Sequence, residues 1–216
     1  MTQAMRVVVL ASGRGSNLGA LMAAQREPDA RFEIVLVAGD KPEAQALRFA
    51  EEAGIATLAL DPRGYPDRAS FDADLFARVA AYAPGLVVLA GFMRILDPGV
   101  LAPWVGRVIN IHPSLLPKYR GLKTHARAIE AGDALHGASV HFVTPELDGG
   151  PVIAQTDLVI EADDTPATLA ARLLPLEHRL LAATVDLIAE GRVALDGERV
   201  RFDGEPLAAP LRIARA

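Results

Sequence analysis

The sequence contains no cysteine among its 216 residues. This absence excludes disulfide bonds, a thiolate nucleophile and a cysteine-ligated metal, and a reducing cytosol is the simplest compartment for such a chain. Basic residues are too few for a nucleic-acid partner, because the formal net charge is −5 and binding to phosphates favours a basic face. The longest apolar run, near Leu86–Met93, is far shorter than the ~20 residues of a membrane span, and Met1–Met5 has no signal-peptide pattern. We therefore expect a cytoplasmic protein that binds neither nucleic acid nor membrane.

Strand and helix patterns alternate along the first half of the chain. With 51% hydrophobic residues, the chain has ample material for one core, and its length predicts one domain. The alternation predicts a parallel sheet with right-handed crossovers. The expected strands cover residues 6–11, 32–38, 55–60, 86–90 and 107–112, and the expected helices cover 18–25, 42–53 and 70–82.

The second half follows a different order. A short helix at 123–132 precedes strands at 136–143 and 152–160, and no crossover fits between those strands, so they are expected to be antiparallel. A long helix capped by Thr165 and a hairpin at 193–201 complete the pattern. The predicted fold is a single Rossmann-like α/β domain with a mostly parallel central sheet, antiparallel additions and helices on both faces. We expect a phosphate-binding half at 1–104, a catalytic half at 105–203 and a mobile tail at 204–216.

Two polar residues end the apolar strand at 107–112. Asn110 and His112 lie two residues apart, so both side chains point to the same face of an extended chain. Pro113 favours an extended backbone at His112, and ligands bind at the carboxyl ends of strands in open α/β sheets. Asp148 precedes two glycines in a turn. Each residue alone is more simply structural, but together they supply a carboxylate, a proton-transferring imidazole and an oxyanion-binding amide.

A glycine-rich turn follows the first predicted strand. Gly13 and Gly15 precede Ser16, Asn17 and a helical pattern, an arrangement that presents backbone N–H groups and a positive helix end to an anion. Leu18 stands where a dinucleotide-binding turn has its third glycine, and no Gly-Lys-Ser/Thr motif follows. The turn therefore predicts a single phosphate site, although Asp40, which ends the second strand, leaves a nicotinamide site open.

Three motifs carry a resemblance to a known family. The chain is similar to the folate-dependent formyltransferases in the sequences NIHPSLLP at 110–117, YRG at 119–121 and LDGG at 147–150. The central motif is long and specific, and the resemblance extends from the loop at Ser12 to about Ala189. Lys123 stands where some relatives carry histidine, and Arg120 where some carry proline. Neither replaces an expected catalytic residue.

The resemblance implies the activity and the residues that perform it. It implies transfer of a formyl group from 10-formyltetrahydrofolate, a co-substrate, to the amine of 5′-phosphoribosylglycinamide in purine biosynthesis, with Asn110, His112 and Asp148 catalytic and with no metal. His136 and His141, an odd number apart in one strand, also argue against a shared metal. His125 is expected only to orient a neighbour. The residues implied to bind the ribonucleotide are Gly15, Ser16, Asn17 and Glu177. The residues implied to bind folate are Arg68, Met93, Arg94, Ile95, Leu96, Asn110, Thr144, Pro145, Glu146, Leu147 and Asp148.

In the expected mechanism, Asn110 binds the developing oxyanion and Asp148 raises the pKa of His112, which supplies a proton. We expect small-molecule substrates and a monomer or homodimer.

Four alternative functions remain. They are an NAD(P)-dependent oxidoreductase built on Gly13, Gly15 and Asp40, a methionyl-tRNA formyltransferase-like protein, a formyltetrahydrofolate hydrolase and a non-catalytic phosphosugar-binding module. The second and third would carry further domains for which this length leaves no room, and the acidic balance suits tRNA poorly.

Overall fold

The computed structural model describes residues 4–213 and divides the chain into two compact units, residues 1–110 and 111–216. We call these the first and second unit. Strand β5, Val108–His112, runs across the boundary between them. The sequence predicted the boundary between the phosphate-binding and catalytic halves near residue 104, just before this strand.

The first unit contains a parallel sheet in the order β5-β4-β1-β2-β3. Its further strands are β1 (Met5–Leu10), β2 (Phe32–Gly39), β3 (Thr57–Ala59) and β4 (Leu86–Leu89). Residues 7–11 and 86–88 are fully buried, as expected for parallel strands covered on both faces. Because β1 connects outward to β2 and β4 pairs with its other edge, the strand order reverses between β1 and β4.

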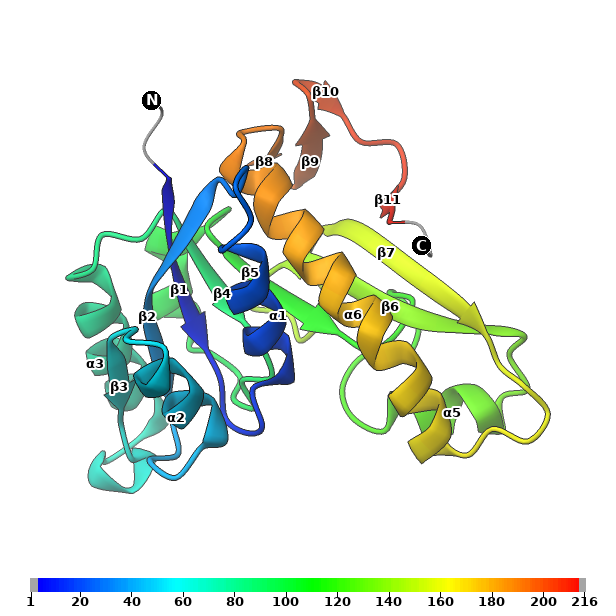
Figure 1. The fold of residues 1–216 in the computed structure, drawn as a ribbon, viewed down its shortest axis with the longest axis horizontal. Coiled ribbons are helices and arrows are strands. Elements are labelled where there is room, and N and C mark those ends of the chain that lie inside the picture. The colour runs from blue at the N-terminus through cyan, green and yellow to red at the C-terminus, as the bar shows by residue number, and fades with distance from the viewer. Residues whose placement is uncertain (1–3, 214–216) are drawn as a thin grey trace. The chain divides into compact units, whose positions relative to one another are not determined.

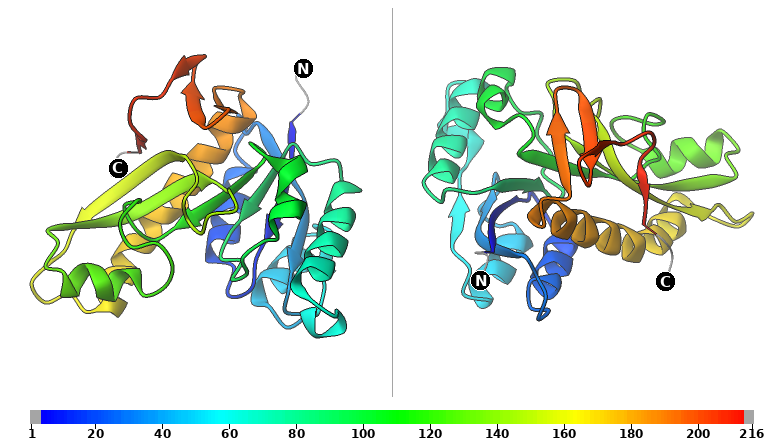
Figure 2. Two further views of the ribbon diagram at one scale, coloured as in Figure 1. Left: turned by 180° about the vertical axis from the view of Figure 1, so that it is seen from behind. Right: turned by 90° about the horizontal axis from the view of Figure 1, so that it is seen from above.

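Helices cover both faces of this sheet. Helices α1 (Ser16–Ala24) and α2 (Gln45–Glu52) lie on one face, and α3 (Arg68–Ala80) and α4 (Pro98–Leu101) on the other (Figure 2). Short 3-10 turns, η1 (Pro62–Gly64) and η2 (Ala102–Trp104), join them to neighbouring elements. The predicted alternation is confirmed, but α2 begins three residues after Pro42, which lies in a turn instead. Asp67 caps α3 by accepting the N–H of Ser70, so that helix begins two residues earlier than predicted.

The second unit combines an antiparallel strand pair with a long helix. Strand β6 (Leu135–Phe142) pairs antiparallel with β7 (Val152–Val159), as predicted. Helix α6 (Pro166–Ala189) packs along both strands (Figure 1), and the short helix α5 (Thr124–Glu130) packs against α6. The side chains and backbones of Thr165 and Thr168 form a capping box at the start of α6, which confirms the predicted cap. An irregularity between Val140 and His141 interrupts the strict side-to-side alternation along β6.

The region expected to be a mobile tail is partly paired. After the hairpin of β8 (Val193–Asp196) and β9 (Arg199–Phe202), strand β10 (Glu205–Pro206) pairs with β9, and β11 (Leu211–Arg212) pairs parallel with β7. The segment therefore contains two short paired strands that the sequence did not predict, and its mobility stays a prediction. The remainder of that prediction, residues 214–216, lies outside the described residues.

A tight turn between β6 and β7 places Asp148. A β-carbon built on Gly150 would lie 1.9 Å from the carbonyl oxygen of Phe142, whereas the three atoms nearest to one built on Gly149 all belong to the side chain of Glu146. The Phe142 N–H donates to the carbonyl of Pro151 at 3.0 Å, so backbone closes the turn at this point. Only glycine fits at position 150.

We expect Gly150→Ala to lower the free energy of unfolding by about 1–3 kcal/mol, because the added methyl group must push two backbone segments apart. Thermal and denaturant unfolding measure this loss. Gly149→Ala is the matched control, since the flexible Glu146 side chain can move away. Equal stability of the two variants would contradict the backbone constraint at Gly150.

Candidate active site

His112 ends β5 as a buried side chain with both ring nitrogens near oxygen atoms. Its Nε2 lies 2.9 Å from the carbonyl oxygen of Tyr119, and its Nδ1 lies 3.4 Å from Oδ2 of Asp148. A carbonyl oxygen only accepts hydrogen bonds, so Nε2 carries the hydrogen in the neutral ring. Nδ1 is then the basic nitrogen, and it is the one that faces the carboxylate. The structure thus brings together two of the three predicted catalytic side chains.

Asp148 lies between two imidazoles. Its Oδ2 accepts the N–H of Gly121 at 2.9 Å, and its Oδ1 lies 3.6 Å from Nε2 of His141. The opposite nitrogen of His141 lies 2.9 Å from the carbonyl oxygen of Phe142. The backbone of Asp148 adopts the left-handed conformation at φ 47°, which directs its side chain back towards these partners. A carboxylate between two imidazoles is suited to hold and release a proton.

The pKa values of the pair follow from burial and from these partners. Burial lowers the pKa of His112, while the Tyr119 carbonyl and the charge of Asp148 act in the opposite direction without cancelling it. Burial raises the pKa of Asp148, but hydrogen bonds from His141 and Gly121 and the histidine charges bring it below its ordinary value. Asp148 thus raises the pKa of His112, as the sequence predicted, but burial has the larger effect and the net shift is downward. A neutral imidazole beside an ionised carboxylate is suited to begin as a base.

A buried polar network supports the segment after His112. Ser139 on β6 donates through Oγ to the carbonyl of Ser114 at 2.7 Å and accepts the N–H of Leu116 at 3.1 Å. Gln155 on β7 donates through Nε2 to the Leu116 carbonyl and to Ser139 Oγ, both at 2.9 Å. Sequence reasoning missed these two residues, although both are polar positions within predicted strands. They satisfy the loop backbone and so fix where the segment leaves β5.

Asn110, the third predicted catalytic residue, lies two positions before His112 in β5 and is partly exposed. Its register partner in β4 is Leu89. Alternation along a strand gives the amide and the imidazole the same face. Asn110 can therefore donate to a group that approaches the carboxyl end of β5.

The predicted phosphate site is the amino end of α1 in the first unit. Gly15 precedes the helix at φ 78°, and its position against Ala46 leaves no room for a side chain. The first turn of α1 has no side-chain cap, and the N–H groups of such a turn, here including Ser16 and Asn17, suit an anion. Ser12 joins this turn to the segment after β4, since its N–H donates to the Gly91 carbonyl at 3.1 Å and its Oγ accepts the Met93 N–H at 2.9 Å. This junction lies where the strand order reverses, the usual ligand position in such sheets.

The segment after β4 presents apolar side chains outward. Met93 and Ile95 are 70% and 50% exposed, whereas Leu96 is buried. Buried Asp72 on α3 accepts the N–H of Asp97 at 2.8 Å and so anchors the far end of the segment. An exposed apolar stretch held at both ends is suited to line a pocket for an aromatic ligand.

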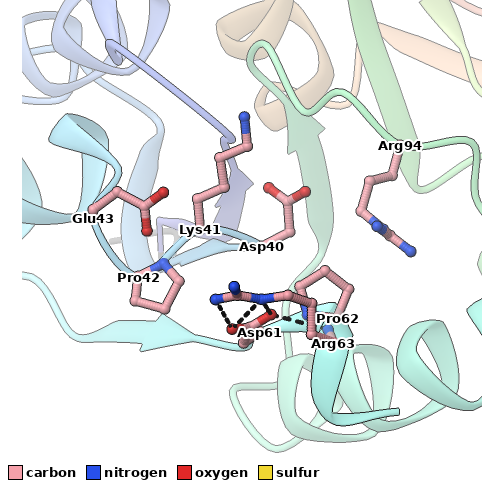
Figure 3. A pocket seen from close by; sticks show the side chains of 8 residues that line it. All are labelled: Asp40, Lys41, Pro42, Glu43, Asp61, Pro62, Arg63 and Arg94. Carbon is pink, nitrogen blue, oxygen red and sulfur yellow. Dashed lines mark hydrogen bonds and ion pairs between the residues drawn. The ribbon is translucent and has the colours of Figure 1, made fainter. Parts of the chain in front are cut away.

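Arg94 from the same segment lines a pocket of about 340 Å³ in the first unit. Its guanidinium lies over the ring of Phe71, 4.5 Å from the centroid. The side chains of Asp40 and Lys41 extend into this region from the end of β2 (Figure 3). Arg68, another predicted folate contact, begins α3 and is exposed. The pocket is also lined by Pro42, Glu43, Asp61, Pro62 and Arg63.

The remaining predicted residues lie in the second unit. Thr144–Asp148 forms the loop between β6 and β7, and Glu146 in it makes an ion pair with Arg120. Arg120, which departs from some relatives, thus joins the segment after His112 to this loop. Lys123, the other departure, precedes α5 as an exposed residue at φ 59°. Glu177, which the resemblance implies contacts the ribonucleotide, is buried on α6.

His125 and His136 form a second imidazole pair in this unit. Nδ1 of His125 lies 2.9 Å from Nε2 of His136, and burial lowers the pKa of His136 to about 4. His136 is therefore neutral at neutral pH, and burial also lowers the pKa of His125. Across residues 4–213, three or more histidine, aspartate or glutamate side chains never gather closely enough to hold a metal ion. Over the same range no helix has the length and apolar character of a membrane span.

Comparison with known proteins identifies relatives along nearly the whole chain. The family described as Formyl transferase matches residues 5–185. The chain is 44% identical to a phosphoribosylglycinamide formyltransferase of Escherichia coli, over 94% of this chain and 96% of that protein. A solved phosphoribosylglycinamide formyltransferase from Coxiella burnetii superposes with a TM-score of 0.94 at 41% identity, covering 98% of this chain and all of that one. A glycinamide ribonucleotide transformylase from Symbiobacterium toebii has a TM-score of 0.90 at 40% identity, covering 94% and 95%.

These similarities confirm the predicted fold class, an α/β domain with a mostly parallel sheet, antiparallel additions and helices on both faces. They also agree with the motifs at 110–117 and 147–150, which contain the closely spaced His112 and Asp148. The chain belongs to the formyl transferase family.

Proposed function

We propose that this chain transfers the formyl group of 10-formyltetrahydrofolate to the amine of 5′-phosphoribosylglycinamide. The products are formylglycinamide ribonucleotide and tetrahydrofolate, in the de novo synthesis of purines. The observation that carries the proposal is the contact of His112 Nδ1 with Asp148 at 3.4 Å, in a chain similar over its length to enzymes named for this substrate. It acts in the cytoplasm as a monomer or homodimer, and both of its substrates are small molecules.

The catalytic residues act on one proton and one oxyanion. The amine nitrogen attacks the formyl carbon, a C–N bond forms and the carbonyl oxygen gains negative charge, which the amide of Asn110 stabilises. Neutral His112 accepts the amine proton at Nδ1, and Asp148 stabilises the resulting imidazolium. His112 then returns the proton to N10 of the folate as the bond from N10 to the formyl carbon breaks. One proton moves from amine to folate nitrogen, and no covalent enzyme intermediate forms.

The proposed substrate contacts are those that the family resemblance implies. The first turn of α1, with Gly15, Ser16 and Asn17, binds the phosphate, and Glu177 on α6 contacts the ribonucleotide. The folate binds against the segment Met93–Leu96, with Asn110 and the loop Thr144–Asp148, and Arg68 meets its carboxylate tail. The exposed apolar surfaces of Met93 and Ile95 support this assignment. The division into a phosphate-binding half and a catalytic half remains part of the proposal.

Ultraviolet spectroscopy tests the function directly. The protein is mixed with phosphoribosylglycinamide and a 10-formyl folate analogue, and the absorbance of the deformylated folate is followed. We expect a signal only when both compounds are present, and none when glycinamide without phosphoribose replaces the ribonucleotide. Deformylation without any amine would indicate a hydrolase. A change that requires NADH would support the oxidoreductase in which Asp40 binds a ribose.

A further inference from the structure

A backbone carbonyl determines which ring nitrogen of His112 carries the hydrogen and which one faces Asp148 as a base. The carbonyl oxygen of Tyr119 lies 2.9 Å from Nε2 and fixes the hydrogen there. If this carbonyl moved away from Nε2, the hydrogen could move to Nδ1. The nitrogen that faces Asp148 would then no longer be a base. The location of the Tyr119 peptide therefore bears on catalysis through its carbonyl oxygen.

The backbone of Tyr119 adopts a conformation that non-glycine residues rarely occupy. Its φ is 55°, in the left-handed region, and side chains in that region crowd the backbone. Such a residue keeps its conformation only when its surroundings hold it there. The turn around it, in which Gly121 is also at positive φ, is held by bonds to residues elsewhere in the chain.

Asp133 accepts hydrogen bonds from two side chains of this turn. The Tyr119 hydroxyl donates to Asp133 Oδ2 at 2.7 Å, and the Lys118 ammonium donates to Oδ1 at 2.9 Å. The N–H of Asp133 donates to the Ala128 carbonyl at 3.1 Å, which attaches the residue to the end of α5. The hydrogen bond from Lys118, followed by that from Tyr119, lowers the pKa of Asp133. The acceptor is therefore an ionised carboxylate fixed to a helix.

Arg127 on α5 holds the same turn from another side. Its guanidinium lies over the Tyr119 ring, 5.1 Å from the centroid, and its Nη1 donates to the Arg120 carbonyl at 2.7 Å. Ser114 also donates through Oγ to the Lys118 carbonyl at 2.6 Å. The turn is thus held by Arg127 on α5, by Asp133 beyond the end of that helix and by Ser114.

We propose that Tyr119 and Asp133 are positioning residues, whose hydroxyl–carboxylate bond holds the Tyr119 carbonyl against Nε2 of His112 and so keeps Nδ1 as the catalytic base. This proposal rests on the proposed role of His112. It assigns a function to the hydrogen bond from the Tyr119 phenol to the Asp133 carboxylate, which the chemical steps themselves do not use.

The test variant is Tyr119→Phe, which removes the hydroxyl but keeps the ring beneath Arg127. We expect kcat to fall on the order of ten- to a hundredfold, the effect of a small misplacement of a reacting group. KM for both substrates should stay within about twofold, because no substrate contact is removed. Asp133→Asn keeps an oxygen that can accept from the phenol, so it should retain more activity than Asp133→Ala.

The pH profile separates positioning from a loss of stability. The Tyr119 carbonyl raises the pKa of His112 against the effect of burial, so its displacement should move the acidic inflection of kcat to lower pH. The other titratable or charged groups that act on His112 are Asp148, His141 and Arg127, and His112 in turn acts on His125 and His136. Tyr119→Phe changes none of these groups.

Tyr65→Phe is the matched control. Tyr65 donates its hydroxyl to Asp74 Oδ2 at 2.5 Å in the first unit, so the variant removes the same kind of hydrogen bond at a place that the proposed mechanism does not use. We expect wild-type kcat and an unchanged pH profile. A loss of kcat equal to that of Tyr119→Phe would show a general effect of removing a tyrosine–aspartate bond and would overturn the proposal.

Nitrogen-15 NMR of the imidazoles, without substrate, reads the tautomer independently of turnover. The wild type should show one His112 signal protonated at Nε2, assigned with His112→Asn, and Tyr119→Phe should show a mixture. An inactive wild type with this NMR change would remove the proposed function but keep the positioning role. An unchanged tautomer in folded Tyr119→Phe and in Asp133→Ala, with wild-type kcat, overturns the inference.

Discussion

Asp148→Asn should lower kcat by roughly 10²- to 10⁴-fold, the contribution of a positioned acid–base group. The carboxylate faces the basic nitrogen of His112 at 3.4 Å, and an amide cannot stabilise the imidazolium by charge. The amide can still accept the Gly121 N–H that now binds Oδ2, so the turn should keep its shape. Steady-state turnover and thermal unfolding, measured on the same samples, separate the two effects.

The pH dependence of this variant has a defined sign. The charge of Asp148 raises the pKa of His112 against the effect of burial. Its removal leaves burial less opposed, so the pKa of His112 falls further and the acidic inflection of kcat moves to lower pH. Loss of turnover without this movement would assign Asp148 to substrate binding instead.

Asp203→Asn provides a control for the loss of a paired carboxylate. Asp203 accepts two hydrogen bonds from Arg192 at 2.8 Å in an exposed hairpin, and no step of the mechanism uses it. We expect turnover within about twofold of wild type, as for most surface substitutions. Near-wild-type turnover in Asp148→Asn would remove that carboxylate from the mechanism.

The fold was predictable wherever hydrophobic periodicity carries the information. The buried runs at Val7–Ala11 and Leu86–Ala90 and the capped helix after Thr165 follow from residue types within short windows. Strand β11 does not, because two residues pair with β7 more than fifty positions earlier along the chain. Such a pairing depends on backbone hydrogen bonds that leave no pattern in the side chains. The start of α2 was misplaced for a local reason, because proline at position 42 suits a turn as well as the first turn of a helix.

The candidate site was predictable in its side chains and much less so in its backbone. The NIHPSLLP and LDGG motifs identified His112 and Asp148, which lie in contact. The carbonyl of Tyr119 was missed because every residue has a carbonyl, so no residue type marks the one that selects a tautomer. The effect of burial on the pKa of His112 was also missed, because burial depends on the whole packed structure, and here it outweighs the predicted effect of Asp148.

Asn110→Ala should lower kcat by roughly 10²- to 10³-fold, because one donor to a developing oxyanion is removed. Asn110 lies two residues before His112 on the same strand and is partly exposed, so truncation leaves no large cavity. KM for the ribonucleotide should change little, since the proposed contact forms fully only as charge develops on the oxygen. Asn110→Asp keeps the shape but replaces the donor with a negative charge near the oxyanion, and it should be at least as inactive. Its carboxylate should also raise the pKa of His112, opposite in sign to the effect of Asp148→Asn. Steady-state kinetics across pH measures both effects, and a loss confined to KM in Asn110→Ala would assign this amide to substrate binding in the ground state.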